Sequence, residues 1–282
     1  MKTGIIDVGG GQRGIYAAGV LDYCMDKGIT FDVGIGVSAG SANLSSFVAR
    51  QRGRNYKFYT EYSMRDEYMS VQNVRTKGCF LDVNYIYGTL SNEGGEYPLD
   101  YRAYVENPTD LIVVATEAET GYAKYFSKGD LKTNHYEVLM ASSAIPHVCN
   151  AQTVDHISYF DGALSDPVPV ALLSSLGCDA MVLLLTKPID TRPYPSEDIK
   201  LAAKIEQRYP QAAKKLCLRE DAYQQGVKLA QKYAEEGKLL IVAPETTCGV
   251  TTLSRDLAAL NMLYTKGYAD GERIEEFLKA FG

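Results

Sequence analysis

The chain has 282 residues, 46% of them hydrophobic, so it can bury a large core in one or two domains. Its formal net charge is −6, which gives no support for nucleic-acid binding or for attraction to anionic membranes. No run approaches the roughly 20 apolar residues of a membrane span, and the apolar stretch at the N-terminus is too short for a secretory signal, so we expect a cytoplasmic protein.

Residues 1–50 are expected to alternate between strands and helices. Residues 3–8 form an apolar run that ends in glycines, and residues 15–27 carry apolar side chains at helical spacing up to Gly28, a plausible C-cap. Residues 31–37 predict a second buried strand, and residues 41–50 predict a second helix. This strand–helix–strand order predicts an α/β fold with a mostly parallel, doubly wound sheet.

The rest of the chain continues this pattern. Residues 54–105 are polar and rich in tyrosine, and we expect helices and loops that cover an edge of the core or form a lid. Strands are predicted at 111–116, 123–126, 156–160, 180–185 and 239–243, and helices at 136–143, 168–176, 197–237 and 253–280. No linker or repeat interrupts the chain, so residues 1–282 are expected to form a single domain, in which residues 190–237 could be a peripheral helical subdomain.

The second strand-to-helix junction carries a serine between glycines. Gly36, Ser38 and Gly40 form the pattern G-x-S-x-G, in which the serine stands on a sharp turn with its hydroxyl exposed at the end of the sheet. The glycines remove side chains where strand and helix pass closely, and the N-terminus of the following helix favours developing negative charge. The pattern predicts a nucleophile, although a tight turn with a capping serine would have the same sequence.

The first strand-to-helix junction is a glycine loop. Its order, G-x-G-x-x-G, suggests a dinucleotide site, but such a site needs an acidic residue at the end of the next strand, and Asp32 stands at that strand's start. Backbone N–H groups of a glycine loop can instead bind an oxyanion, and losing one such donor can cost about 2.7–4 kcal/mol. Because successive parallel strands tend to be neighbours, we expect this loop beside Ser38. The expected oxyanion and substrate-binding residues are Gly9, Gly10, Gly11, Arg13 and Gly14.

Arg13 has two interpretations: it could orient the loop or meet an anionic head group, or it could be an ordinary surface cation.

A third motif, Asp161-Gly162-Ala163, follows the strand predicted at 156–160. A carboxylate at a strand end can reach across to a neighbouring turn, although Asp-Gly is also a common turn sequence.

A Ser-His-Asp triad would require a histidine base, which follows the acid in the sequence of an α/β-hydrolase. His135, His147 and His156 all precede Asp161. His156 is expected within a strand and His135 in a solvated loop, which leaves either His147 as a base or a Ser–Asp dyad without histidine. The scattered cysteines contain no CxxC pair, so no metal site is expected.

Together and in this order, the three motifs resemble the patatin-like phospholipase family, with GGGQRG, GVSAG and DGA in this chain. Residues 141–146 and 249–267 are also similar to stretches of family members. The resemblance implies a three-layer α/β/α fold, Ser38 as nucleophile, Asp161 as general base, oxyanion donors from residues 9–14, and no metal or other cofactor. It implies hydrolysis of fatty-acyl esters of phospholipids or lysophospholipids, which could bring transient contact with a membrane surface. Asp7-Val8 before the glycines departs from the family pattern.

Two other functions remain open at this point. An esterase or thioesterase acting on soluble acyl substrates fits the lack of a clear membrane-docking helix. A non-catalytic lipid- or nucleotide-binding module on the same fold would not need both Ser38 and Asp161. A lone aspartate with an ordinary pKa of about 3.9 is a weak base at neutral pH, so we expect the pKa of Asp161 to be raised. The sequence does not fix the oligomeric state, the acyl chain or the head group.

Overall fold

The computed structural model describes residues 1–191 and 195–281. At its centre lies an 8-stranded sheet with the strand order β5-β6-β3-β2-β1-β7-β8, and β4 pairs with β3 outside this path. The strands β1, β2, β3, β7 and β8 pair in parallel, whereas β4, β5 and β6 pair antiparallel, which confirms a mostly parallel sheet. Their bounds are β1 (Thr3–Asp7), β2 (Val33–Val37), β3 (Asp110–Glu117), β4 (Ala123–Phe126), β5 (Gln152–Val154), β6 (Ile157–Asp161), β7 (Ala180–Leu184) and β8 (Leu239–Val242).

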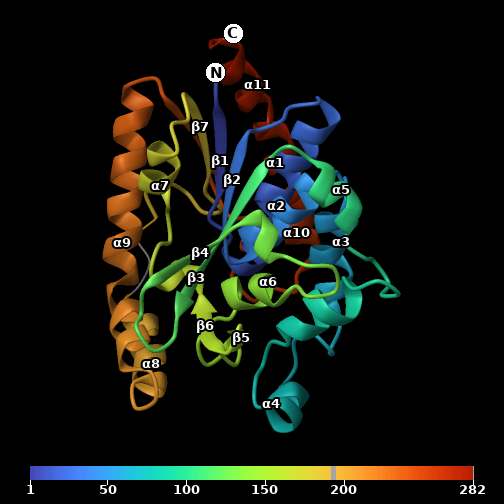
Figure 1. Cartoon of the computed structure of the whole chain (residues 1–282), viewed down its shortest axis with the longest axis vertical. Coiled ribbons are helices and arrows are strands. Elements are labelled where there is room, and N and C mark those ends of the chain that lie inside the picture. The colour runs from blue at the N-terminus through green and yellow to red at the C-terminus, as the bar shows by residue number, and fades with distance from the viewer. Residues whose placement is uncertain (192–194, 282) are drawn as a thin grey trace.

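Helices cover both faces of the sheet, so the expected three-layer α/β/α arrangement is confirmed (Figure 1). One face carries α1 (Ile15–Asp26), α2 (Ala39–Val48) and α10 (Leu257–Asp270), and the other carries α7 (Val170–Ser175) and α9 (Pro210–Glu235). Successive side chains of β1 point to opposite faces of the sheet. Ile5 packs into the core on the α1 side and Ile6 into the core on the α9 side, as the alternation of strand side chains requires.

The expected cover over residues 54–105 is built into the core on the α1 side. Its buried tyrosines belong to the same apolar cluster as α1 and α2, and they include Tyr59, Tyr62, Tyr87 and Tyr104. The remaining helices are η1 (Gly11–Gly14), α3 (Arg54–Thr60), η2 (Tyr62–Met64), α4 (Val71–Lys77), η3 (Tyr85–Leu90), α5 (Tyr101–Glu106), η4 (Lys128–Asp130), α6 (Glu137–Ser142), η5 (Gly162–Leu164), α8 (Pro195–Ile205) and α11 (Glu272–Lys279).

The prediction for His156 is wrong. The short strand β5 was not expected, and Asp155 and His156 form the turn that joins it to β6, with φ values of 48° and 67°. Two successive residues with positive φ fit the tight turn of a two-residue hairpin, so the strand begins at Ile157, one residue later than expected. His156 is consequently exposed rather than packed in a strand.

The pairing of β3 brings the ends of two other strands together. Along β3, Val114 pairs with Val37 of the parallel strand β2, and the next residue, Ala115, pairs with Asp161 of the antiparallel strand β6. The strand β4 pairs with residues on both sides of this point and therefore occupies the opposite edge of β3. The C-terminal ends of β2 and β6 thus meet on one edge of β3, and this brings Ser38, which follows β2, next to Asp161.

Candidate active site

Ser38 lies on the turn between β2 and α2 with φ 56° and ψ −133°, a backbone conformation that L-amino acids rarely adopt. Its N–H donates to Ser142 Oγ at 2.9 Å, and Ser142 Oγ donates to the carbonyl of Val114 at 2.6 Å. The hydroxyl of Ser41 donates to the Ser38 carbonyl at 2.6 Å. These bonds on both sides of the residue hold the strained turn, as expected where strain serves a site.

The two glycines of the motif let the strand and the helix approach. A Cβ atom on Gly36 would lie 2.4 Å from the Cα of Ser41, and one on Gly40 would lie 2.2 Å from the backbone oxygen of Asp7. Both distances are too short for carbon, and both neighbours are backbone atoms that cannot rotate away. The turn that presents Ser38 therefore closes only with glycine at these positions.

A Gly40→Ala variant is expected to lose about 1–3 kcal/mol of unfolding free energy, because the added methyl group forces β1 and α2 apart. Urea unfolding followed by circular dichroism measures the loss. The matched control is Gly129→Ala, since the nearest atom to its added Cβ would lie 3.9 Å away. Equal stability of the two variants would contradict the close approach at Gly40.

Asp161 is hydrogen-bonded directly to Ser38. The Ser38 hydroxyl donates to Asp161 Oδ2 at 2.6 Å, and the Ala163 N–H donates to Asp161 Oδ1 at 2.9 Å. The side chain of Thr116 donates to the Asp161 carbonyl at 2.8 Å. Gly162 fits here because a Cβ would lie 2.2 Å from the Val114 oxygen. The motif Asp161-Gly162-Ala163 thus orients one carboxylate oxygen toward its own turn and the other toward the serine.

Burial sets the acidity of this carboxyl group. Ser38 is 6% exposed and Asp161 is 3% exposed. Loss of hydration raises the pKa of Asp161 to about 6, against the lowering effects of the Ser38 and Ala163 hydrogen bonds and of the Arg219 charge. The expected rise in the pKa of Asp161 has burial as its largest cause.

The glycine loop lies against the N-terminus of α2, beside Ser38. Gly9, Gly10 and Gly11 have φ values of 67°, 115° and 58°, in the positive region that glycine adopts far more readily than other residues. A Cβ on Gly9 would lie 2.8 Å from the backbone nitrogen of Gly40. Within residues 1–191 and 195–281, the N–H groups of Gly10 and Gly11 have no protein acceptor, unlike the Gly9 N–H, which donates to Asp7 Oδ1 at 2.9 Å. The loop therefore offers two free backbone donors.

Asp7 anchors this loop from below. The carboxylate is fully buried, and its second oxygen accepts from Asn43 Nδ2 at 2.9 Å. Asn43 Oδ1 in turn accepts from the Tyr59 hydroxyl at 3.1 Å. Burial raises the pKa of Asp7 to about 6. The departure from the family pattern noted at Asp7 is thus part of the support for the loop.

Gly14 was expected among the oxyanion and substrate-binding residues, but it packs under Tyr59 and does not line the cavity.

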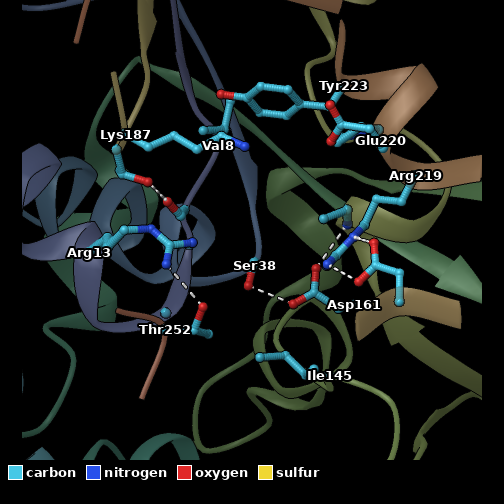
Figure 2. Close-up of a pocket in the computed structure, with 17 residues that line it drawn as sticks. Val8, Arg13, Ser38, Ile145, Asp161, Lys187, Arg219, Glu220, Tyr223 and Thr252 are labelled. Atoms are coloured by element: carbon cyan, nitrogen blue, oxygen red, sulfur yellow. Dashed lines mark hydrogen bonds and ion pairs between the residues drawn. The ribbon is translucent and has the colours of Figure 1, made fainter. Parts of the chain in front are cut away.

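A cavity of about 170 Å³ opens above Ser38 and Asp161. Figure 2 shows Arg13 and Thr252 on one side of Ser38, Asp161 and Arg219 on the other, and Lys187 and Tyr223 across the cavity. Arg13 donates to Thr252 Oγ1 at 3.1 Å. The residues after β7 and those on α9 were not predicted as site residues: Thr186, Lys187, Arg219, Glu220 and Tyr223.

The histidines lie away from this cavity. His135 is 72% exposed, with Nδ1 3.3 Å from Glu137 Oε1. His147 is also exposed, and its Nε2 is 2.9 Å from Lys204 Nζ. None of the three histidines lines the cavity, so the histidine-base alternative receives no geometric support.

In the described parts of the chain, no group of three or more His, Cys, Asp or Glu side chains is arranged to hold a metal ion. In the same residues, no helix is both long and apolar enough to cross a bilayer.

Residues 8–174, more than half of the chain, match the model of the family described as patatin-like phospholipase, and residues 209–281 match a domain of unknown function, DUF6363. The uncharacterized protein YjjU of Escherichia coli strain K12 is 31% identical over 192 residues, which cover 66% of this chain and 52% of that protein. The chain thus spans about half the length of that relative. A solved structure, VipD from Legionella pneumophila, aligns over 99% of this chain and 67% of its own, with 11% identity and a TM-score of 0.47. By the match over residues 8–174, the chain belongs to the patatin-like phospholipase family.

Proposed function

We propose that this chain is a serine acyl hydrolase that cleaves fatty-acyl esters of phospholipids or lysophospholipids. Ser38 is the nucleophile and Asp161 is the general base. The observation that carries the proposal is the 2.6 Å hydrogen bond from the Ser38 hydroxyl to a buried carboxylate oxygen of Asp161. A buried carboxylate with a raised pKa, bonded to a hydroxyl on a strained turn beside free backbone donors, combines the parts that acyl transfer needs.

The chemistry follows from these positions. Asp161 accepts the proton as Ser38 Oγ attacks the acyl carbonyl carbon, and the carbonyl oxygen becomes an oxyanion. The N–H groups of Gly10 and Gly11 stabilise this charge. The tetrahedral intermediate collapses as the leaving alcohol takes the proton from Asp161, which leaves an acyl-enzyme. Water then attacks the acyl-enzyme as it gives a proton to Asp161. Ser38 Oγ takes this proton as the second tetrahedral intermediate collapses, which releases the fatty acid and restores the free serine and the Asp161 carboxylate.

Activity is expected to fall as the pH drops through about 6, because Asp161 accepts a proton only when it is ionised and its pKa is raised to about 6. Asp7, with a pKa also raised to about 6, loses its charge in the same range and then holds the Gly9 N–H less well, so both groups act in the same direction. The measurement is kcat/KM for a soluble ester against pH. A flat profile down to about pH 4, the ordinary range of a carboxyl group, would contradict the role of Asp161.

A substrate panel tests the proposed reaction. Fatty-acid release is measured from a phospholipid and a lysophospholipid in mixed micelles, and from a soluble ester and thioester of matched acyl length, with Ser38→Ala as the blank. We expect the highest kcat/KM on one of the lipid esters. A preference for the soluble substrates would identify a soluble esterase or thioesterase, and lipid binding without any turnover would identify a non-catalytic module.

We also propose that the chain forms one domain rather than a core with a peripheral subdomain at residues 190–237. Residues 192–194 and 282 of the expected domain lie outside the described residues. In support, Ala212 and Leu216 of α9 pack in one apolar cluster with Phe160 of β6. The strand β8, which follows α9, pairs with β7 in the central sheet.

A further inference from the structure

The cavity is also lined by charged and aromatic side chains that the proposed hydrolysis does not use. We call this set the recognition wall, and it consists of Arg13, Lys187, Arg219, Glu220 and Tyr223. Lys187 lies three residues after the end of β7, so it is at the same edge of the sheet as the loops that carry Arg13 and Ser38. Its Nζ sits 3.8 Å from the centre of the Tyr223 ring, which orients the ammonium group by a cation–π interaction. Tyr223 comes from α9, within the segment that matches a domain of unknown function.

Three cations and three carboxylates line the cavity, but they are not all paired with one another. Arg219 and Asp198 neutralise one another in a two-bond ion pair, with distances of 2.9 and 2.6 Å. Asp161 is committed to Ser38. Two cations, Arg13 and Lys187, then stand against one carboxylate, Glu220. In the described chain, neither cation has a carboxylate oxygen within 4.0 Å, and the partner of Arg13 is the neutral hydroxyl of Thr252.

Polar atoms of the same wall also lack partners. In the part of the chain that the structure describes, Arg13 Nε, Glu220 Oε2 and Tyr223 OH are buried and make no hydrogen bond. Tyr223 itself is 8% exposed. Buried polar groups in proteins nearly always make hydrogen bonds. Three such atoms without a protein partner around one cavity therefore indicate that a polar ligand or water binds there.

We infer that Lys187, held by Tyr223 and acting with Arg13, forms an anion subsite that selects acyl esters carrying a phosphate group on the alcohol side. The inference rests on the proposed hydrolysis at Ser38 and adds the residues that recognise the phosphate of its substrates. The phosphate of a bound substrate would face Lys187 and Arg13, while the acyl carbonyl of the same substrate reaches Ser38. The helix α9 gains a role as the element that supplies the wall for substrate recognition.

The test compares two soluble esters of the same acyl group, 1-hexanoylglycerol 3-phosphate and 1-hexanoylglycerol. The quantity of interest is the ratio of kcat/KM for the phosphorylated ester to kcat/KM for the neutral one. In Lys187→Met this ratio is expected to fall about tenfold or more, as expected for a lost hydrogen bond between charged groups. Lys187→Arg keeps the charge and should keep most of the ratio. Lys228→Met, an exposed lysine on α9 outside the cavity, is the matched control.

Glu220→Gln provides a change of opposite sign. Removing its negative charge should raise the ratio, which general damage to the fold would not do. An unchanged ratio in Lys187→Met, or equal losses on both esters, would overturn the subsite and leave the proposed hydrolysis intact.

Titration with inorganic phosphate separates the subsite from the reaction. Isothermal calorimetry of the full chain should give a dissociation constant that weakens about tenfold in Lys187→Met. If the wild type hydrolyses neither ester but binds phosphate through Lys187, the subsite stands and the proposed hydrolysis fails. If wild type and Lys187→Met bind phosphate equally or not at all, and the ratio of the two esters is also unchanged, the subsite is rejected for both free phosphate and phosphate esters.

Discussion

Replacing Ser38 with alanine is expected to lower kcat/KM for acyl-ester hydrolysis by at least about 10⁴-fold, because the variant keeps the oxyanion donors and the cavity but has no nucleophile. Asp161 would lose the hydroxyl that donates to it at 2.6 Å and would remain buried without that bond. Fatty-acid release from the best lipid substrate measures the effect.

Ser45→Ala is the matched control for this prediction. Ser45 lies on α2, the helix that follows Ser38, is 1% exposed, and donates to the Ser41 carbonyl at 2.8 Å without reaching the cavity. This variant should keep its activity within a small factor of wild type. Residual activity in Ser38→Ala comparable to Ser45→Ala would contradict a covalent mechanism at Ser38.

The second large effect is expected for Asp161→Asn, which should lower kcat/KM by about 10³- to 10⁴-fold. The amide has the shape of the carboxylate, and its oxygen can still accept the Ala163 N–H that now bonds at 2.9 Å. Its nitrogen cannot take a proton from Ser38, so the fold is kept while the base is lost. Single-turnover kinetics of acyl-enzyme formation measure the step directly.

Asp166→Asn controls for the loss of a partly buried acid near the site. Asp166 accepts from the Tyr125 hydroxyl at 2.8 Å and does not line the cavity, and burial raises the pKa of its carboxyl as well. Near-normal turnover is expected in this variant. If Asp161→Asn retained the rate of Asp166→Asn, another group would have to be the base.

Much of the fold could be predicted because apolar runs and glycines mark element ends in this chain. The strands at 111–116 and 180–185 were expected from unbroken apolar sequence, and both are central strands of the sheet, β3 and β7. The hairpin turn at Asp155 and His156 was missed, because both residues have positive φ values but neither is a glycine, the residue that usually marks such a turn in a sequence.

The site could be predicted only in part. Local motifs predicted that Ser38 and Asp161 end strands, but not that β6 runs antiparallel and meets β2 on one edge of β3, since strand pairing depends on the whole sheet. Ser142, whose hydroxyl accepts the Ser38 N–H, lies 104 positions from its partner. Lys187 could have been suspected, because it follows a parallel strand at the edge where the other motifs lie. Tyr223 on α9 carries no such local signal.

The central claim is that Ser38 is a nucleophile activated by Asp161, and the most direct measurement is the site and rate of labelling by a fluorophosphonate. Wild type, Ser38→Ala and Asp161→Asn are treated under the same conditions, and intact mass and peptide mapping locate the adduct. We expect one adduct on wild type, carried by the peptide that contains Ser38, none on Ser38→Ala, and slow labelling of Asp161→Asn. A folded wild type that stays unlabelled, or an adduct that persists in Ser38→Ala, would contradict the account.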